Sequence, residues 1–570
     1  MGVSAAIFES AGKRTEHYVP GVYSRSHNVT SPSGVSAGNL CILGSSTGGK
    51  PFSLLEFGSV ADAKNVLGSG ELVNAIAYAF NGSNDYVPQR VYAMRINQGT
   101  QASLMLANGS TNIMKLNAWD YSAATNQLKL KIENGAVANS KKVTVIFKDS
   151  TVEVDNIVKA SLQVIGTCTD PTVTVNNTGI ILAGTDDDGG EVKETINFED
   201  FPTINEVVEK INDTDYFTAT SLDADENALS SNLDTATSTD ISVATKLYSN
   251  AIALKNALEG IEYIESVEMQ GDSKIVPENI SLTYFSGGES KTASILDWRT
   301  ALEMLETENI QIIATPSTDE DAQVLIANHC VSMSTTVNRK ERTCFLGGAL
   351  NETDEAAIAK AIGFNNKLVS YVTDTVVTAN PITGATETIN GAMLSCMLAG
   401  MESAMAVNQP LTNKKIKVLG FAKKRTITNM EKLIKAGVVV CNPSPDDVTN
   451  YVVIRALTTY QSDDLISNER SMVREDLYMN RDLRNRFASS IGNPGNIPVS
   501  AILTTLNDAA KEWASAGYII PSDSNENVWN KSVKVNGDKI YITYSRYLTA
   551  PTNFIFITAT NHVYTSTLEV

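Results

Sequence analysis

The chain has 570 residues and a formal net charge of −19, from 45 basic and 64 acidic side chains. This length predicts roughly three to five domains, and a composition of 42% hydrophobic and 19% charged residues is typical of a folded protein. The acidic balance argues against a nucleic-acid partner, because phosphate recognition needs a basic surface. The longest uncharged apolar-rich stretch, at 391–401, is too short to cross a bilayer, so membrane insertion is excluded.

Cysteine and histidine usage indicates a protein made in a cytoplasm, with few groups for metal or acid–base chemistry. The first residues lack the basic start and the apolar core of an export signal. The six cysteines are scattered without a CxxC pair, which favours reduced and buried thiols. The histidines are only four, namely His17, His27, His329 and His562.

The first hundred residues predict an arm followed by the beginning of an α/β region. Residues 1–30 show no helical period and contain the break Pro20-Gly21, so we expect an extended N-terminal arm. Residues 31–100 then alternate strand and helix signals, as in an α/β unit. The expected elements are a buried strand at 39–43, helices at 59–67 and 71–80, and a strand at 90–96.

Residues 101–290 predict an inserted, β-rich and acidic part, as one domain or as two. Between residues 186 and 240 sixteen acidic side chains face two basic ones, a net charge of −14, which favours a solvated outer face. The run Asp186–Gly190 resembles a calcium loop. Aligning its glycine with that of the loop, however, places Gly184 and Thr195 at ligand positions, so we reject a cation site.

Residues 291–540 alternate helices with short apolar strands, which predicts a three-layer α/β core domain within a chain of the α+β multidomain class. Residues 541–570 predict C-terminal strands that end in an arm. Polar and apolar residues alternate around Tyr541, and the run 553–558 follows Pro551 as a second expected strand.

One glycine-rich turn fits two catalytic patterns incompletely. The residues Gly44–Lys50 have the spacing of a phosphate-binding loop, but Pro51 stands where a magnesium-binding hydroxyl is needed. The same turn matches a nucleophile elbow around Ser46, without a histidine that the sequence can connect to it. A hydrolase using Lys50 or Ser46 is therefore a remote alternative. His329, Cys330 and Cys344 lack the paired spacing of a metal site, and we predict no catalytic residue, cofactor or metal.

A basic cluster stands out in this acidic chain. Between residues 411 and 435 eight basic side chains face the single acidic Glu431, a net charge of +7. The cluster is either a docking surface for an acidic partner or a solvated helix and loop. Its members are Lys414, Lys415, Lys417, Lys423, Lys424, Arg425, Lys432 and Lys435.

Four ordered blocks resemble the contractile tail sheath proteins of myovirus-type bacteriophages. The first combines Ser36–Gly44, Gly48-Gly49 and the helices from Ser59 to Phe80. The second runs from Trp298 to Pro316 and from Asn338 to Gly348. The third and fourth are Thr426–Val440 with Val453–Tyr460, and Tyr541–Thr558. Together the blocks cover residues 18–97 and 292–560, and the stretch between them has no pattern that we can match.

The resemblance implies a structural subunit and no enzyme. Such subunits form hexameric rings that stack helically around a tail tube, in an extended and metastable state. Contraction then drives the tube through the host envelope without nucleotide hydrolysis. Further implied partners are the baseplate and tail terminator proteins, and the implied location is the virion, after assembly in the host bacterial cytoplasm. An R-type bacteriocin sheath, or that of another contractile injection system, is the alternative.

The resemblance also implies roles for particular residues. The two arms would link subunits by adding strands to the sheet of a neighbour. The basic cluster would contact the tube or a neighbouring subunit, and the acidic part would face outward. The residues expected to take part in strand exchange are Tyr18, Val19, Val22, Tyr23, Phe554, Phe556 and Val563.

Overall fold

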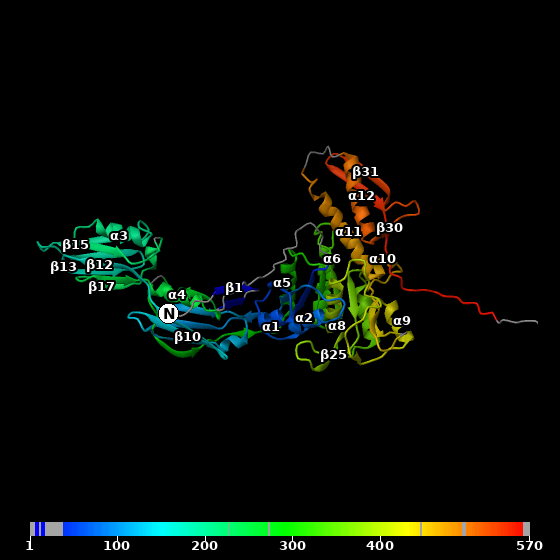
Figure 1. Ribbon diagram of the computed structural model, residues 1–570, viewed down its shortest axis with the longest axis horizontal. Coiled ribbons are helices and arrows are strands. Elements are labelled where there is room, and N and C mark those ends of the chain that lie inside the picture. Colours follow the sequence, from blue (N-terminus) through cyan, green and yellow to red (C-terminus); the bar gives the residue numbers. More distant parts are fainter. Residues whose placement is uncertain are drawn as a thin grey trace, which may run out of the picture. The chain divides into compact units, whose positions relative to one another are not determined.

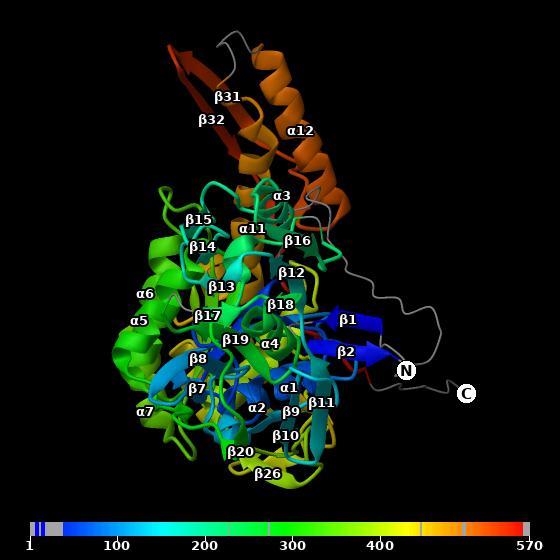
Figure 2. The same cartoon turned by 90° about the vertical axis from the view of Figure 1, so that its left-hand side faces the viewer.

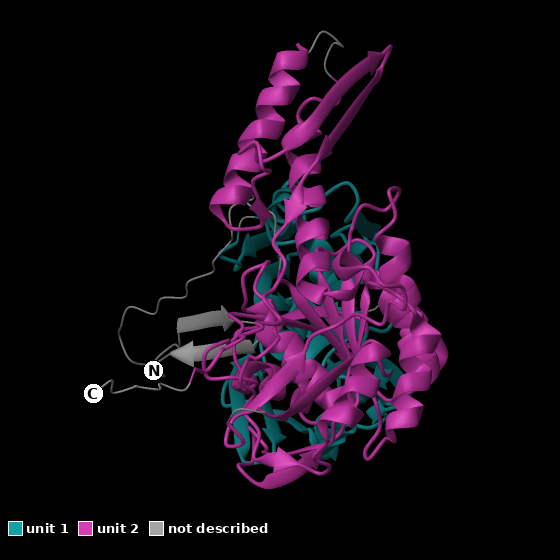
Figure 3. Cartoon of the chain, turned by 90° about the vertical axis from the view of Figure 1, so that its right-hand side faces the viewer, with its two compact units in different colours: residues 1–20, 47–51, 98–292 teal, residues 21–46, 52–97, 293–570 magenta. Residues whose placement is uncertain are grey.

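The computed structural model of the chain describes residues 6–10, 13–17, 38–225, 227–271, 274–444, 447–492 and 498–562. The chain divides into two compact units, each discontinuous in sequence (Figure 3). Unit 1 comprises residues 1–20, 47–51 and 98–292, and unit 2 comprises residues 21–46, 52–97 and 293–570. Helices and several separate sheets are present, so the predicted α+β multidomain class is confirmed. None of the described helices is long and apolar enough to span a membrane.

Unit 2 is built on an eight-stranded sheet with the order β29-β28-β24-β23-β22-β3-β5-β4. The inner strands are parallel, and β29 and β4 pair antiparallel at the edges. All five residues of β3 are buried, as expected of a parallel strand covered on both faces. In sheet order the strands are Tyr451–Arg455, Val438–Pro443, Val369–Val372, Thr343–Gly347, Ile312–Ala314, Leu40–Gly44, Val91–Arg95 and Leu54–Phe57.

Alternate side chains of β3 enter two different hydrophobic cores. Leu40 and Ile42 pack with residues of α1, α2 and α8, whereas Cys41 and Leu43 pack with residues of α5, α6, α7 and α9. Successive side chains of a strand point to opposite faces, so each core occupies its own face of the sheet. The helices are α1 (Val60–Leu67), α2 (Glu71–Phe80), α5 (Ile295–Leu305), α6 (Glu320–Met333), α7 (Asp354–Phe364), α8 (Gly391–Ser403) and α9 (Ile427–Lys435).

The last part of unit 2 has its own small core, which centres on the buried Trp513. Its helices are α10 (Leu465–Asn468), α11 (Arg470–Ala488) and α12 (Val499–Ser515). Its strands are β30 (Ile519–Ile520), β31 (Trp529–Asn536), β32 (Lys539–Ser545) and β33 (Tyr547–Leu548), which pair as β30–β33 and β31–β32. A separate three-stranded sheet of unit 2 consists of β25 (Val376–Ala379), β26 (Thr386–Ile389) and β27 (Gly420–Phe421).

Unit 1 contains two hydrophobic cores, one nested in the sequence of the other. The first takes its residues from Ala102 to Ile157 and from Ala251 to Phe285. The second takes its residues from Leu162 to Leu247. Figure 1 shows the two groups of elements, with α4 and β10 in one and α3, β12, β13, β15 and β17 in the other. Unit 1 therefore combines two separate hydrophobic cores within one compact unit.

The elements of unit 1 are mostly antiparallel strands. Around the first core they are β7 (Ser103–Asn108), β8 (Thr111–Ala118), β9 (Lys129–Asn134), β10 (Lys141–Phe147), β11 (Ser150–Ile157), α4 (Asn250–Glu259), β19 (Ile264–Met269) and β20 (Ile280–Tyr284). Around the second core they are β12 (Ala160–Gly166), β13 (Thr169–Val175), β14 (Gly179–Thr185), β15 (Glu191–Asn197), α3 (Ile204–Asn212), β16 (Phe217–Ser221), β17 (Ala236–Asp240) and β18 (Thr245–Tyr248). Short elements are β6 (Gly99–Thr100), β21 (Glu289–Ser290), η1 (Ala123–Gln127) and η2 (Ser230–Asn232).

The predicted N-terminal arm is described in part. Its strands β1 (Ala6–Ser10) and β2 (Lys13–His17) pair antiparallel as a hairpin. Four residues expected to exchange strands, namely Tyr18, Val19, Val22 and Tyr23, lie outside the described residues, as does Val563 near the other end of the chain.

Candidate assembly surfaces

The C-terminal segment after β33 exposes a run of apolar side chains. Residues 549–562 contain neither helix nor strand, so the strand that we expected at 553–558 is absent. The reason is physical: a strand needs a hydrogen-bonded neighbour, and none of the described strands pairs with this run. The exposed fractions of its four apolar residues are 67% for Phe554, 78% for Ile555, 92% for Phe556 and 87% for Ile557. In Figure 1 the segment is the red trace that runs out from the last part of unit 2.

Four consecutive exposed apolar side chains are typical of a surface that binds another protein. Exposed large apolar side chains that follow one another mark an interaction site, whereas single ones are ordinary. The rings of Phe554 and Phe556 are nearly parallel, with centroids 6.3 Å apart, as for residues i and i+2 on one face of an extended chain. Phe554 and Phe556, both predicted site residues, therefore lie on one extended segment, with which none of the described strands pairs.

The hairpin of β31 and β32 is a second surface with unpaired backbone. It is a two-stranded sheet, so both outer edges lack a partner strand among the described residues. Near its base Ile542 and Tyr544 pack against the core around Trp513, while Val535 and Tyr541 toward its tip are 48% and 53% exposed. Figure 2 shows this ribbon beside α11 and α12. Open edges of this kind accept added strands.

A buried carboxyl group lies near the root of the C-terminal segment. Glu475 on α11 is 0% exposed, and neither of its carboxylate oxygens has a hydrogen-bond partner among the described residues. Burial raises the pKa of Glu475 to about 8, although the neighbouring charges of Arg474 and Arg546 favour its ionised form. The Thr549 N–H, which faces this carboxyl group, donates to the carbonyl oxygen of Tyr518 (3.1 Å).

The Glu475→Gln variant is expected to remove a pH dependence of the stability. A carboxyl group with a raised pKa stabilises the folded state below its unfolded pKa of about 4.5, and this contribution is lost as the pH rises through about 8. The melting temperature of the wild type should therefore fall relative to that of the variant between pH 4.5 and 8, and level off above. Thermal scans across this range test it, with the exposed Glu303→Gln as a control that follows the wild type. Parallel courses for the wild type and Glu475→Gln would contradict the assignment.

Of the eight residues of the basic cluster, six are exposed, one is half-buried and one is buried. Lys415, Lys417, Lys423, Lys424, Lys432 and Lys435 are exposed, and Lys414 is half-buried with its Nζ 5.8 Å from the centre of the Tyr86 ring. Arg425, in contrast, is buried: its guanidinium donates to Asp354 Oδ1 (3.1 and 3.0 Å) and to Asp374. The inclusion of Arg425 in the exposed cluster was therefore wrong, because its charge is neutralised inside unit 2.

Three backbone N–H groups of the turn at Gly44–Lys50 are already bonded to side chains of the chain itself. The Ser45 N–H donates to Glu71 Oε1 (3.1 Å) and the Ser46 N–H to Asn97 Oδ1 (3.0 Å). The Gly49 N–H donates to Asp120 Oδ1 (2.6 Å). Side-chain oxygens of the chain itself thus occupy donors that a phosphate would need. Ser46, moreover, is 4% exposed and poorly accessible to a substrate.

Cys330 and Cys344 lie in the hydrophobic core of unit 2, and His329 on the same helix as Cys330 contacts a buried arginine. His329 Nε2 lies 2.7 Å from Nη1 of Arg342, which is fully buried. Burial and this neighbouring charge lower the pKa of His329 to about 4, so the ring is neutral at pH 7 and its Nε2 accepts a hydrogen bond from Arg342. Among the described residues no group of three or more His, Cys, Asp or Glu side chains could hold a metal ion.

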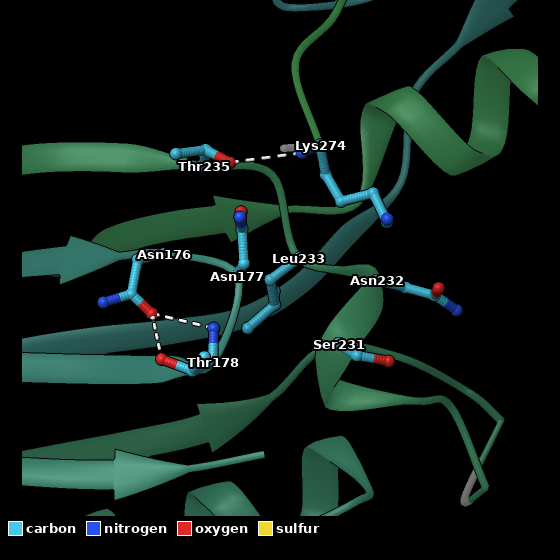
Figure 4. A pocket seen from close by; sticks show the side chains of 8 residues that line it. All are labelled: Asn176, Asn177, Thr178, Ser231, Asn232, Leu233, Thr235 and Lys274. Carbon is cyan, nitrogen blue, oxygen red and sulfur yellow. Dashed lines mark hydrogen bonds between the residues drawn. The ribbon is translucent and has the colours of Figure 1, made fainter. Parts of the chain in front are cut away.

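A polar hollow of about 420 Å³ lies in the second core region of unit 1 (Figure 4). Its lining residues are Asn176, Asn177, Thr178, Ser231, Asn232, Leu233, Thr235 and Lys274. The Asn176 Oδ1 atom already accepts from the N–H and the hydroxyl of Thr178, both at 2.9 Å. Asn232 and Ser231 point away from Asn176 in Figure 4, so the polar groups do not converge on one ligand position.

The sequence left two features of these surfaces unrecognised. The strand β31 and its open edge were not predicted, although Val533 and Val535 alternate with polar residues there. The contact of Asn553 with Glu469, 84 residues earlier in the chain, has no local signal at all. The strand β31 could have been predicted from its alternating polar and apolar residues. The Asn553–Glu469 contact could be found only from the structure.

Comparison with known proteins gives a consistent result. No family model matches the chain. It is 24% identical to a tail sheath protein of Bacillus phage SP01 over 553 residues, which cover 90% of both chains. It is 23% identical to a tail sheath protein of Staphylococcus phage Twort over 509 residues, which cover 79% of this chain and 84% of the relative.

Solved structures show the same fold. A sheath tail protein of Desulfitobacterium hafniense superposes with a TM-score of 0.53 at 13% identity, covering 93% of this chain and all of the other. A sheath tail protein of Listeria innocua gives a TM-score of 0.55 at 13% identity, covering 90% and 95% of the two chains. The sequence relatives and the shared fold confirm the resemblance: over most of its length the chain is similar to phage tail sheath proteins.

Proposed function

We propose that the chain is the structural subunit of a contractile phage tail sheath. The observation that carries this proposal is the similarity to a phage tail sheath protein over 90% of both chains. The subunits form hexameric rings, which stack helically around a tail tube protein in an extended and metastable state. Contraction then drives the tube through the host envelope. The sheath also meets a baseplate and a tail terminator protein, in a virion assembled in the host cytoplasm.

Neighbouring subunits are linked by strand addition. The C-terminal segment, with Phe554 and Phe556, supplies one strand, and the N-terminal arm, with Tyr18, Val19, Val22 and Tyr23, supplies another. The hairpin β31–β32 has two open edges, which suits it to accept one strand from each of two neighbours. Links of this kind can persist while the bodies of the subunits move, which contraction requires.

The subunit has no enzymatic role in this proposal. The energy of contraction is stored as a difference between two packings of the same subunits. The occupied donors of the turn at Gly44–Lys50 and the poor access to Ser46 argue against a hydrolase using Lys50 or Ser46. The bacteriocin alternative is not favoured, because the sequence relatives are named as phage proteins.

In this proposal the eight-stranded sheet of unit 2 and the helices on its two faces form the layered core of the sheath subunit, and this core lies next to the tube. Unit 1, with the acidic residues 186–240, faces outward, where a high net charge keeps crowded subunits soluble. The exposed lysines between Lys414 and Lys435 then contact the tube or a neighbouring subunit. Contacts of this kind are weak and screened by salt, as a tube that must be released requires.

Replacing Lys415, Lys424 and Lys432 by glutamate is expected to weaken tube decoration roughly tenfold or more, because like charges then face an acidic partner. The folding of the variant should be unchanged, since all three side chains are exposed. Co-sedimentation with the tube protein measures the effect. A matched control, Lys64, Lys367 and Lys511 changed to glutamate, alters the net charge equally at exposed positions of the same unit. Equal decoration by both triple variants would refute the contact.

The function itself is tested by negative-stain electron microscopy of the purified chain at high concentration, with and without salt. Hollow cylinders with a regular helical striation are the expected result. If only dispersed monomers form, the cognate tube protein is added as a template. Monomers that persist in the presence of the tube would exclude a sheath subunit.

A further inference from the structure

The root of the C-terminal segment is bonded to one buried carboxylate. Glu469, the residue before α11, is 0% exposed. Its Oε1 atom accepts from Nε and Nη2 of Arg455, at 2.9 and 2.6 Å, and from Nδ2 of Asn553 at 3.0 Å. Its Oε2 atom has no hydrogen-bond partner among the described residues, so Arg455 and the amide of Asn553 together compensate this buried charge. The segment is thereby fixed at Asn553.

Arg455 extends this contact to the next residue. The central carbon of its guanidinium lies 5.7 Å from the centre of the Phe554 ring, a cation–π arrangement. From Ile555 to Ile557 the side chains are 78% to 92% exposed. Asn553 is thus hydrogen-bonded to the body of unit 2, whereas Ile555, two residues later, is exposed to solvent. Phe554 marks the boundary between the held and the exposed part of the segment.

We propose that Glu469 and Arg455 form a clamp, which fixes the direction of the C-terminal segment and makes Ile555 the first residue free to pair with a second copy of the chain. The inference rests on the proposed function and narrows it, since it starts the donated strand at Ile555 and leaves Phe554 with the clamp instead of among the pairing residues. Slipping a strand by one residue turns every side chain to the opposite face. A fixed start therefore decides whether Phe556 or Ile557 faces the core of the accepting subunit. Glu469 and Arg455 act as positioning residues and take no part in the pairing.

Limited chymotrypsin digestion of the unassembled full-length chain tests the clamp directly. A protease needs several extended residues on both sides of the cleaved bond, so the wild type should be cut after Phe556 much faster than after Phe554. In Asn553→Ala the ratio of cutting after Phe554 to cutting after Phe556 should rise roughly tenfold or more, because a hydrogen bond to a charged group is lost. The exposed neighbour Thr552→Ala is the matched control and should keep the wild-type ratio. An unchanged ratio in Asn553→Ala overturns the clamp.

Helical assemblies of the same variants test the positioning role. Wild-type cylinders should have one helical rise and twist by electron cryomicroscopy, whereas Asn553→Ala should give mixed lattices or no cylinders. A single wild-type lattice in Asn553→Ala overturns the positioning role, even when the digestion ratio changes. Deleting residues 555–570 distinguishes a failure of the clamp from a failure of the proposed strand donation. If the shortened chain polymerises like the wild type, strand donation by this segment is wrong, whatever the digestion shows.

Discussion

The double variant Phe556→Asp and Ile557→Asp is expected to abolish polymerisation while the chain folds normally. In the free chain these side chains are 92% and 87% exposed, so they contribute almost nothing to its folding. In the assembly the one of the two that faces the core of the accepting subunit is expected to bury its apolar surface, which stabilises the contact by about 1.5–3 kcal/mol. Replacing both side chains removes this burial in either register and places a charge at the buried position, which should raise the concentration needed for polymerisation by roughly a hundredfold or more.

Sedimentation of a concentration series measures this effect, together with thermal unfolding of the unassembled chain. The conservative pair Phe556→Leu and Ile557→Val keeps the apolar surface and should polymerise near the wild-type concentration. Cylinders formed by the aspartate variant at that concentration would show that the segment is not an assembly contact. A large drop in its melting temperature would show instead that the segment belongs to the folded body.

Helices were predicted best where a capping residue coincides with an apolar period. The range expected at 59–67 consists of the N-cap Ser59, whose side chain accepts from the Asp62 N–H, and the helix α1. The Ser294 hydroxyl and the Asp297 carboxylate form the capping box at the start of α5, and Asp319 caps α6, so these helices begin where the sequence indicates. Buried parallel strands such as β3 were also recognised, because both faces are covered and the run is uniformly apolar.

Elements that depend on distant partners were not predictable in this way. The apolar run 553–558 has the composition of a strand, yet no neighbour for it exists among the described strands. The second core of unit 1 starts after Ile157 and ends before Ala251, within the sequence of the first core. Local alternation marks strands there, but it does not say which strands share a core.

Charge counts predict a surface only approximately. The net charge of +7 between residues 411 and 435 treats every basic residue alike, although Arg425 is held inside by Asp354 and Asp374. These acids lie 71 and 51 residues earlier in the chain, so the pairing has no local signal. The lysines differ because their flexible stems and strongly hydrated charges favour the surface.

The Glu402→Gln variant is expected to lower the free energy of unfolding of unit 2 by about 3–5 kcal/mol, the typical effect of removing one partner from a buried ion pair. Glu402 on α8 is 2% exposed and accepts from Nε (2.8 and 3.0 Å) and Nη2 (2.8 Å) of Arg470. Arg474 adds a second cation, with Nη1 3.8 Å from Oε1. Burial opposes the ionisation of Glu402, yet the two arginines prevail and lower its pKa. Without this carboxylate two buried positive charges lose their counter-charge.

The effect should be measured by urea denaturation, with hydrogen exchange of β23 reporting on the sheet. The choice of strand follows from Arg470, which also donates to the carbonyl oxygen of Cys344 (3.2 Å) and to Oγ1 of Thr343 (2.9 Å). Loss of its counter-charge should therefore loosen the middle of the sheet. The exposed pair of Lys511 and Asp508 provides the matched control, since Asp508→Asn removes a carboxylate that is 54% exposed and should change the stability by less than about 1 kcal/mol. Similar losses in the two variants would mean that burial does not govern the strength of these ion pairs.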